Sequence, residues 1–223
     1  VDPIDGTQNF IRRLDSFAAL IALVIDDSIE VAVLHAAALG QQWWAVRGAG
    51  AYRTRVDDQT LAVDAATLFA LAAAGSARSA DGPPLHTRIW TRCGAPTVSA
   101  GGDPLQGAAL SFGGIHLMAH DPAKWSSLQR LAQRVAYSRG IGDWLGHVRV
   151  AEGKLDLMLD PIVAPYDVAA VAGLISEAGG VFTSLSGEPG FDHGSGLSAA
   201  NVALHEAAIA DLAVAWSTRG GET

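Results

Sequence analysis

The chain has 223 residues, of which 49% are hydrophobic and 17% are charged, and its formal net charge at pH 7 is −8. This length and composition predict a folded protein with a substantial core, and the negative charge argues against nucleic acid as a partner. The single cysteine, Cys93, excludes an internal disulfide and favours a reducing cytoplasm as the location.

The chain begins with the motif Asp2-Pro3-Ile4-Asp5-Gly6-Thr7, which is followed by Asn9-Phe10. The motif holds two carboxylates, a main-chain carbonyl and a hydroxyl within six residues. Proline fixes its own φ, and the Asp-Gly pair favours a tight turn. Both carboxylates and the Ile4 carbonyl can therefore converge on one hard cation, since Mg²⁺ takes oxygen ligands in near-octahedral geometry. An ordinary surface turn would explain Asp-Gly or Asp-Pro alone, but it explains the whole run poorly.

Residues 1–107 have the pattern of an antiparallel sheet. Strands are predicted over 17–25, 29–34, 43–46, 51–53 and 60–63. The apolar run 17–25 is far shorter than the roughly 20 residues that cross a membrane, so we expect no membrane segment. A helix is predicted over 65–74, and the Gly- and Pro-rich stretches 75–84 and 94–104 predict loops.

Residues 108–223 alternate strand and helix patterns, which predicts a layered α/β half. Strands are predicted over 109–118, 136–138, 155–159, 181–183 and 197–199. Helices are predicted over 122–135, 143–152, from Pro165 to the Gly179-Gly180 pair, and over 204–216. Pro165 stands in a first helical turn, where its missing N–H costs nothing, and the glycine pair is a good helix end.

A second motif opens the helix at Pro165. It reads Pro165-Tyr166-Asp167-Val168-Ala169-Ala170 and runs on into Glu177-Ala178-Gly179-Gly180. Together with the N-terminal run, it resembles the two signatures of the inositol monophosphatase family of Mg²⁺-dependent phosphatases. The first signature matches fully, and the second has Tyr166 where the family usually has Trp. The resemblance covers essentially the whole chain and implies an α+β or α/β layered sandwich of the family's αβαβα type.

The family's leading helices and its Gly-Glu-Glu motif have no counterpart before Val1, so we expect the sandwich to lack its first helices. In the family, a Glu of that motif also binds the metal that activates the nucleophile. We therefore expect a chain that begins at Val1 to bind Mg²⁺ weakly and to turn over poorly. Apolar surface of the first sheet would also be left uncovered.

Within the family, the chain is similar to histidinol-phosphate phosphatases of the actinobacterial type. The similarity lies in the segment 38–45 with its Trp43-Trp44 pair, in 48–52, and in Gly142-Asp143. The alternative interpretation of Trp43-Trp44 is one buried and one half-exposed aromatic side chain on a strand. The resemblance implies hydrolysis of L-histidinol phosphate to L-histidinol in histidine biosynthesis.

Two other functions stay open. Inositol monophosphate, or a sugar or nucleotide phosphate, is the alternative substrate within the same chemistry. A catalytically silent family member that binds or regulates a partner is the alternative of another class. The family is usually dimeric, so the resemblance also implies a homodimer.

The resemblance implies a catalytic site with two or three Mg²⁺ ions. Asp2 would bridge two ions, the Ile4 carbonyl would join the first, and Asp5 and Asp167 would hold the second. Asp167 would also contact the substrate. Because Asp167 begins a helix, we expect the positive end of the helix dipole to keep its proton affinity low.

The remaining predicted site residues would handle phosphate and substrate. Thr7 would orient the attacking water, and the N–H groups of Gly6 and Thr7, at the start of a helix, would bind phosphate. Arg139 matches an arginine that reaches toward the substrate in the family. Asp143 and Asp160 would favour a cationic amino alcohol, although such acids are more often solvated or capping residues.

Overall fold

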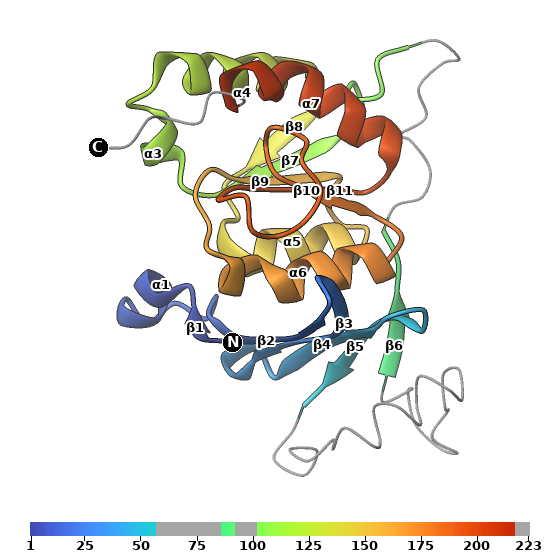
Figure 1. The fold of residues 1–223 in the computed structure, drawn as a ribbon. Helices are drawn as coiled ribbons and strands as arrows, with labels where there is room; N and C mark the ends of the chain where they lie inside the picture. Colours follow the sequence, from blue (N-terminus) through green and yellow to red (C-terminus); the bar gives the residue numbers. More distant parts are fainter. Residues whose placement is uncertain (57–85, 92–101, 217–223) are drawn as a thin grey trace.

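The computed structural model describes residues 1–56, 86–91 and 102–216, in which two β-sheets alternate with two layers of helices (Figure 1). Helices α4 (Pro122–Arg134) and α7 (Val202–Trp216) lie over one face of a five-stranded sheet. Helices α5 (Asp143–Ala151) and α6 (Pro165–Glu177) lie between that sheet and a six-stranded one. This is the layered arrangement expected from the sequence. Within the described ranges, no helix covers the outer face of the six-stranded sheet.

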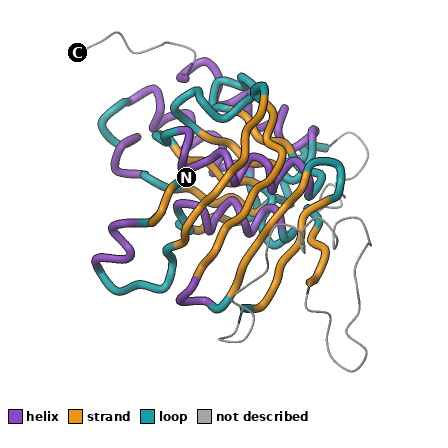
Figure 2. The backbone as a smooth tube through the Cα atoms, turned by 60° about the horizontal axis from the view of Figure 1, so that its bottom comes forward, coloured by secondary structure: helices purple, strands orange, loops and turns teal. Residues whose placement is uncertain are grey.

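The six-stranded sheet is an antiparallel meander in the order β1-β2-β3-β4-β5-β6, and Figure 2 shows its strands in front of the helices. Its strands are β1 (Asp2–Asp5), β2 (Ala18–Ile25), β3 (Ser28–Ala36), β4 (Gln41–Val46), β5 (Gly50–Arg55) and β6 (His86–Ile89). A 3₁₀ turn, η1 (Ala37–Leu39), joins β3 to β4.

The four strands predicted between residues 17 and 53 are confirmed. β1 and β6, of four residues each, are additional strands that the sequence analysis does not predict. The predicted strand 60–63, the helix 65–74, the loop 75–84, most of the loop 94–104 and Cys93 lie outside the described residues.

The five-stranded sheet has the order β10-β11-β9-β7-β8. Its strands are β7 (Ala109–Phe112), β8 (Tyr137–Arg139), β9 (Leu157–Asp160), β10 (Val181–Thr183) and β11 (Gly196–Ala199). β7 runs parallel to β8 and β9, whereas β11 is antiparallel to β9 and β10.

The strand predicted over 109–118 is wrong in its second half. β7 ends at Phe112, and the short helix α3 (Ile115–Met118) follows. Gly114 caps this helix with a φ of 52°, a left-handed conformation that stops the strand and that glycine adopts readily. A second short helix, α1 (Thr7–Ile11), follows β1. None of the helices within the described ranges is long and apolar enough to cross a membrane.

One hydrophobic core runs from the six-stranded sheet across α5 and α6 to the five-stranded sheet. Leu20, Leu34 and Trp43 are neighbours on the inner face of β2, β3 and β4. The Trp43 ring lies 5.5 Å from that of Trp144 on α5. The alternative in which one of Trp43 and Trp44 is half-exposed is wrong, since both are buried. Because the core includes both halves of the chain, the division at residue 107 stays a prediction.

Glu152, which directly follows α5, anchors this helix to the six-stranded sheet. Its side chain is 2% exposed, and its Oε1 accepts hydrogen bonds from Trp43 Nε1 at 3.0 Å and Arg53 Nη1 at 3.2 Å. Its Oε2 accepts from Arg149 at 2.5 Å and Lys154 at 2.7 Å. Burial alone would raise the pKa of this carboxyl, but its donors outweigh burial and hold the pKa below its usual range.

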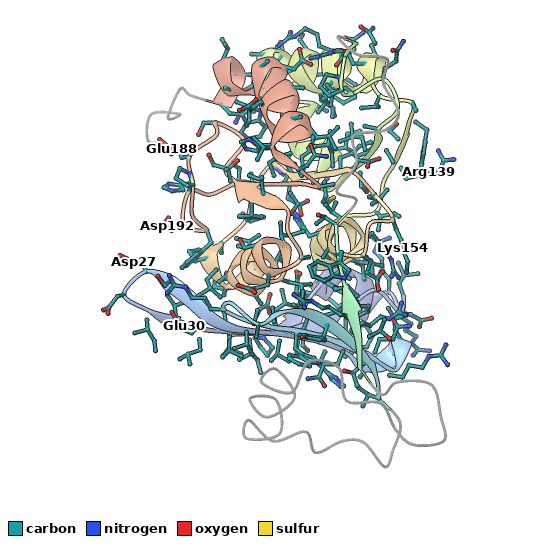
Figure 3. The ribbon with its side chains drawn as sticks, turned by 90° about the vertical axis from the view of Figure 1, so that its right-hand side faces the viewer. Asp27, Glu30, Arg139, Lys154, Glu188 and Asp192 are labelled. Carbon is teal, nitrogen blue, oxygen red and sulfur yellow. The ribbon has the colours of Figure 1, made fainter. Side chains whose placement is uncertain are left out.

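We predict that Glu152→Ala lowers the free energy of unfolding by about 3 kcal/mol, because it leaves the buried Trp43 indole N–H without its acceptor and removes the shared partner of three cations. Glu30→Ala is the control, since Glu30 pairs with Arg47 on the surface, where the side chains are 33% and 60% exposed (Figure 3). Its loss should cost less than about 1 kcal/mol. Urea denaturation measures both, and equal losses would contradict the anchoring role of Glu152.

Candidate active site

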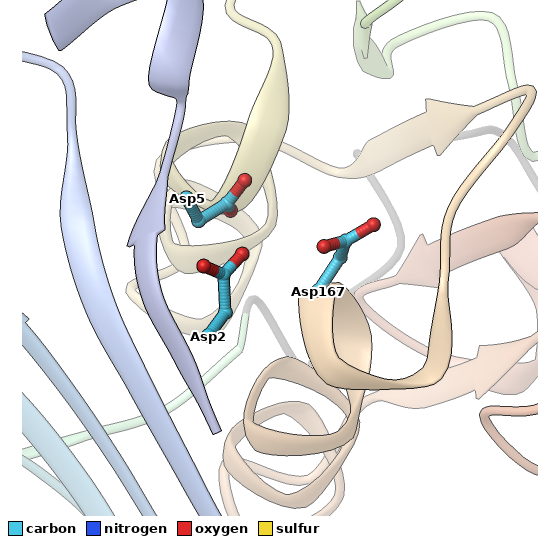
Figure 4. A group of neighbouring side chains, drawn as sticks. All are labelled: Asp2, Asp5 and Asp167. Atoms are coloured by element: carbon cyan, nitrogen blue, oxygen red, sulfur yellow. The ribbon is translucent and has the colours of Figure 1, made fainter.

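Three carboxylates from two distant segments meet between β1 and the first turn of α6 (Figure 4). Asp2 and Asp5 stand on β1, and Asp167 stands in α6. One carboxylate oxygen of each lies within 4.8 Å of the other two. The structure thus brings together the three acids that the sequence predicts as metal ligands, and such hard oxygen donors suit Mg²⁺.

The turn after β1 depends on a glycine. Gly6 has a φ of 76°, and a Cβ there would lie 2.7 Å from the carbonyl oxygen of Ser16. Any other residue would therefore strain the turn and push the neighbouring chain away. Within the turn, Thr7 Oγ1 donates to the Ile4 carbonyl at 2.9 Å, and Ile4 N donates to Asp2 Oδ1 at 3.0 Å. The predicted carbonyl ligand thus lies in the same hydrogen-bonded turn as Asp2.

Asp5 joins this turn to helix α5. Its Oδ1 accepts from Gly6 N at 2.8 Å, and its Oδ2 accepts from Trp144 N at 3.1 Å. Burial, and then the negative charge of Asp143, raise the pKa of Asp5 from 3.8 to about 7, against the effect of the two hydrogen bonds. Of the two N–H groups predicted to bind phosphate, that of Gly6 is therefore already bonded to Asp5.

Asp167 corrects an expectation about charge. Its Oδ2 accepts from Ala164 N at 2.7 Å, which closes the start of α6. Burial nevertheless raises the pKa of Asp167, and the neighbouring Asp2 raises it further. The expected low proton affinity is wrong because desolvation and a nearby acid outweigh the favourable helix start.

Asp143 and Asp160 form a second acidic pair beside the first group. Asp143 begins α5 with a φ of 55°, which is uncommon outside glycine although Asp tolerates it better than most residues. Its Oδ2 accepts from Asn9 Nδ2 at 2.9 Å, and Asn9 also donates to Ser16 O at 3.1 Å. Burial, and then the charge of Asp160, raise the pKa of Asp143.

Four of the site acids described above, all except Asp2, line a hollow of about 280 Å³. The ionisable residues that line it are Asp5, Asp143, Asp160, Asp167, His116 and His147, and its described lining contains neither Lys nor Arg. A second hollow of about 470 Å³ shares Gly114, His116 and Asp143 with the first and has mainly apolar and glycine residues around it. The two form an acidic end and an apolar end of adjoining space.

Arg139 stands apart from these acids. It lies at the end of β8, where its guanidinium donates to the Ser138 carbonyl at 2.7 Å and lies over the ring of Tyr137. Its side chain points outward from the molecule (Figure 3), and it lines neither hollow. A contact between Arg139 and the substrate stays a prediction.

Three groups in or beside the site have no role in the sequence-based prediction. They are the Asn9 amide, the Trp144 backbone N–H and His147. Asn9 belongs to the N-terminal motif, and His147 stands four residues after Asp143, on the same side of a helix. These spacings are the signals that could have found them. A backbone donor such as that of Trp144 leaves no trace in side-chain chemistry.

Comparison with known proteins agrees with this geometry. The model of the inositol monophosphatase family matches residues 1–217. Histidinol-phosphatase of Mycobacterium tuberculosis is 34% identical over 212 residues, which cover 95% of this chain and 68% of the relative. Histidinol-phosphatase of Streptomyces coelicolor is 31% identical over 212 residues, which cover 92% and 65%. The chain thus spans about two thirds of the length of these relatives.

A solved structure supports the fold. Inositol monophosphatase-II of Staphylococcus aureus has a TM-score of 0.72 at 22% identity, over 99% of this chain and 72% of that one. From the match over 217 of its residues, the chain belongs to the inositol monophosphatase family.

Proposed function

We propose that this chain forms the catalytic site of a Mg²⁺-dependent phosphatase for a small phosphate monoester, with L-histidinol phosphate as the preferred substrate. The observation that carries the proposal is the convergence of Asp2, Asp5 and Asp167 within 4.8 Å. Burial, and then neighbouring acids, raise the pKa of both Asp5 and Asp167, which is the cost of gathering carboxylates out of water. Mg²⁺ fits this set because it binds oxygen ligands and carries the opposite charge.

The proposed ligands are Asp2 as a bridge between two ions, the Ile4 carbonyl at the first, and Asp5 with Asp167 at the second. When bound, Mg²⁺ neutralises phosphate charge and lowers the pKa of a coordinated water. This chemistry needs positioning and charge neutralisation rather than a covalent nucleophile. The protein's own contribution is to gather these oxygens on an edge strand and a helix start.

Thr7 would hold the attacking water through its hydroxyl, which otherwise donates to the Ile4 carbonyl. Its backbone N–H opens α1 and, with that of Gly6, would bind a phosphate oxygen. Because Gly6 N is bonded to Asp5, phosphate binding through Gly6 requires this hydrogen bond to be exchanged.

The alcohol part of the substrate would lie against Asp143 and Asp160. With Asp5 and Asp167 engaged by metal, these two acids leave negative charge in a hollow whose described lining has no Lys or Arg. A cationic amino alcohol complements that charge better than a neutral polyol does. This favours histidinol phosphate, and the similarity to histidinol-phosphatases points the same way.

Inositol monophosphate is the second candidate, since Asp160 can also accept a hydrogen bond from a hydroxyl group. We further propose a cytoplasmic homodimer that acts in histidine biosynthesis. A catalytically silent protein would release no phosphate from any monoester in the presence of Mg²⁺. That single assay distinguishes an enzyme from a binding protein.

Asp2→Asn is predicted to abolish Mg²⁺-dependent phosphate release by the full-length protein without unfolding it, because Asp2 is proposed to touch two ions. Asp27→Asn is the matched control, since Asp27 is an exposed hairpin residue with a left-handed φ that Asn also adopts (Figure 3). Circular dichroism reports the fold. More than a tenth of the wild-type rate in Asp2→Asn would contradict the bridging role.

Histidinol phosphate should be preferred over inositol 1-phosphate by at least about tenfold in kcat/KM, equivalent to about 1.4 kcal/mol. The physical reason is the extra attraction between the substrate's ammonium and the acids Asp143 and Asp160. Initial rates with both esters measure the ratio. An equal or reversed preference would move the assignment to the second candidate.

We predict that the metal-free protein loses stability as the pH rises from about 4 to 7. The pKa of Asp5 is about 7 in the folded protein against an ordinary 3.8, so the folded state binds more protons in that window. The free energy of unfolding must then fall with pH. Melting temperatures should show a shallower fall in Asp5→Asn, and in the wild type with saturating Mg²⁺. Identical slopes in all three samples would contradict the prediction.

A further inference from the structure

His147 is buried between two polar partners that the proposed chemistry does not use. It lies in α5, is 1% exposed, and its ring centroid is 5.9 Å from that of Phe182. Its Nδ1 lies 2.7 Å from Ser198 Oγ, and its Nε2 lies 3.0 Å from Asp160 Oδ2. With both ring nitrogens engaged, the imidazole is held in one orientation.

The two partners share one face of the five-stranded sheet. In the antiparallel pair β9 and β11, Asp160 is opposite Gly196 and Met158 is opposite Ser198. Asp160 and Ser198 are thus diagonal neighbours on the same face, and α5 packs on it. His147 connects them from the helix.

The serine hydroxyl decides which ring nitrogen carries the proton. Among the described residues, His147 Nδ1 is the only group hydrogen-bonded to Ser198 Oγ. A hydroxyl proton donated to Nδ1 satisfies both atoms, whereas an Nδ1–H would leave the buried hydroxyl without an acceptor among these residues. We therefore assign the neutral tautomer in which Nε2 carries the ring proton and donates to Asp160 Oδ2.

The other oxygen of Asp160 has a different environment. Oδ1 lies close against Gly113, where a Cβ would come within 1.8 Å of it. A side chain at Gly113 would therefore displace the carboxylate. Asp160 and the next glycine, Gly114, both line the acidic hollow. With Oδ2 bonded to His147, Oδ1 is left to accept a hydrogen bond from a ligand in this hollow.

We propose that His147 is a positioning residue for substrate selection. Fixed as the Nε2–H tautomer by Ser198, it holds Asp160 so that Oδ1 receives an ammonium or hydroxyl group on the alcohol part of the phosphate ester. The inference rests on the proposed function, in which Asp160 contacts that alcohol. The new elements are His147, which acts through Asp160, and the kind of substrate group that Asp160 recognises, an ammonium or a hydroxyl.

Kinetics on the full-length protein with Mg²⁺ test this role through two esters. Histidinol phosphate carries an ammonium group, whereas p-nitrophenyl phosphate has no donor on its alcohol part. His147→Phe keeps an aromatic ring against Phe182 but removes both nitrogens. It should raise KM for histidinol phosphate about tenfold with little change in kcat, and leave KM for p-nitrophenyl phosphate within about twofold.

Matched variants separate positioning from packing. His147→Gln keeps an N–H donor for Asp160 and should restore most of the histidinol phosphate affinity. Ser198→Ala keeps the imidazole but removes the hydroxyl that fixes its tautomer, so it should show a smaller rise in KM for histidinol phosphate. In an Asp160→Ala background, His147→Phe should add less than about twofold. Equal KM losses for both esters, or full additivity with Asp160→Ala, would overturn the proposal.

Nitrogen NMR of the imidazole reads the same arrangement without catalysis. The His147 signal, identified by its loss in His147→Phe, should show a protonated Nε2 and an unprotonated Nδ1, and the reverse tautomer would overturn the proposal.

A wild type that hydrolyses neither ester would refute the proposed function, while the tautomer would still test the positioning. A wild type that prefers histidinol phosphate, with His147→Phe keeping that preference, would refute the positioning alone.

Discussion

The cost of burying several carboxylates close to one another is the constraint on which the site depends. Burial, and then the charge of a neighbouring acid, raise the pKa of Asp5, Asp143 and Asp167. The surrounding backbone offsets part of this cost with N–H donors from a glycine turn and from two helix starts. These donors offset only part of the cost, and the cations proposed for this site would offset more of it.

Helix α5 serves three tasks along its length. Its first turn donates the Trp144 N–H to Asp5, and its middle places His147 against Asp160. Just past its end, Glu152 binds the Trp43 indole and Arg53 of the six-stranded sheet. Helix α5 therefore links the acids to the six-stranded sheet and to the five-stranded sheet on which it packs. A shift of α5 would alter the hydrogen bond to Asp5, the acidic hollow and the packing of the layers together.

Features that depend on neighbouring residues in the chain could be predicted from the sequence. Features that depend on contacts between distant segments could not. The N-terminal motif carries two of the three clustered acids because they are adjacent in the chain, and the longer strands follow from alternating hydrophobic residues. The sequence predicts a low pKa for Asp167 because its place at a helix start is a local feature. The burial and the neighbouring Asp2 that raise this pKa arise only in the folded protein. The partnership of His147 with Ser198 joins residues far apart in sequence, so no spacing rule predicts it.

The connectivity of the layers has a consequence for synthesis on the ribosome. The meander β2 to β5 is made from neighbouring hairpins and can form early, but its inner face packs on α6, which lies far downstream. At about 5–20 residues per second, the nascent sheet waits several seconds with Leu20 and Leu34 uncovered. Exposed strands in that interval attract other chains, so the newly made protein has a period in which chaperone binding competes with aggregation.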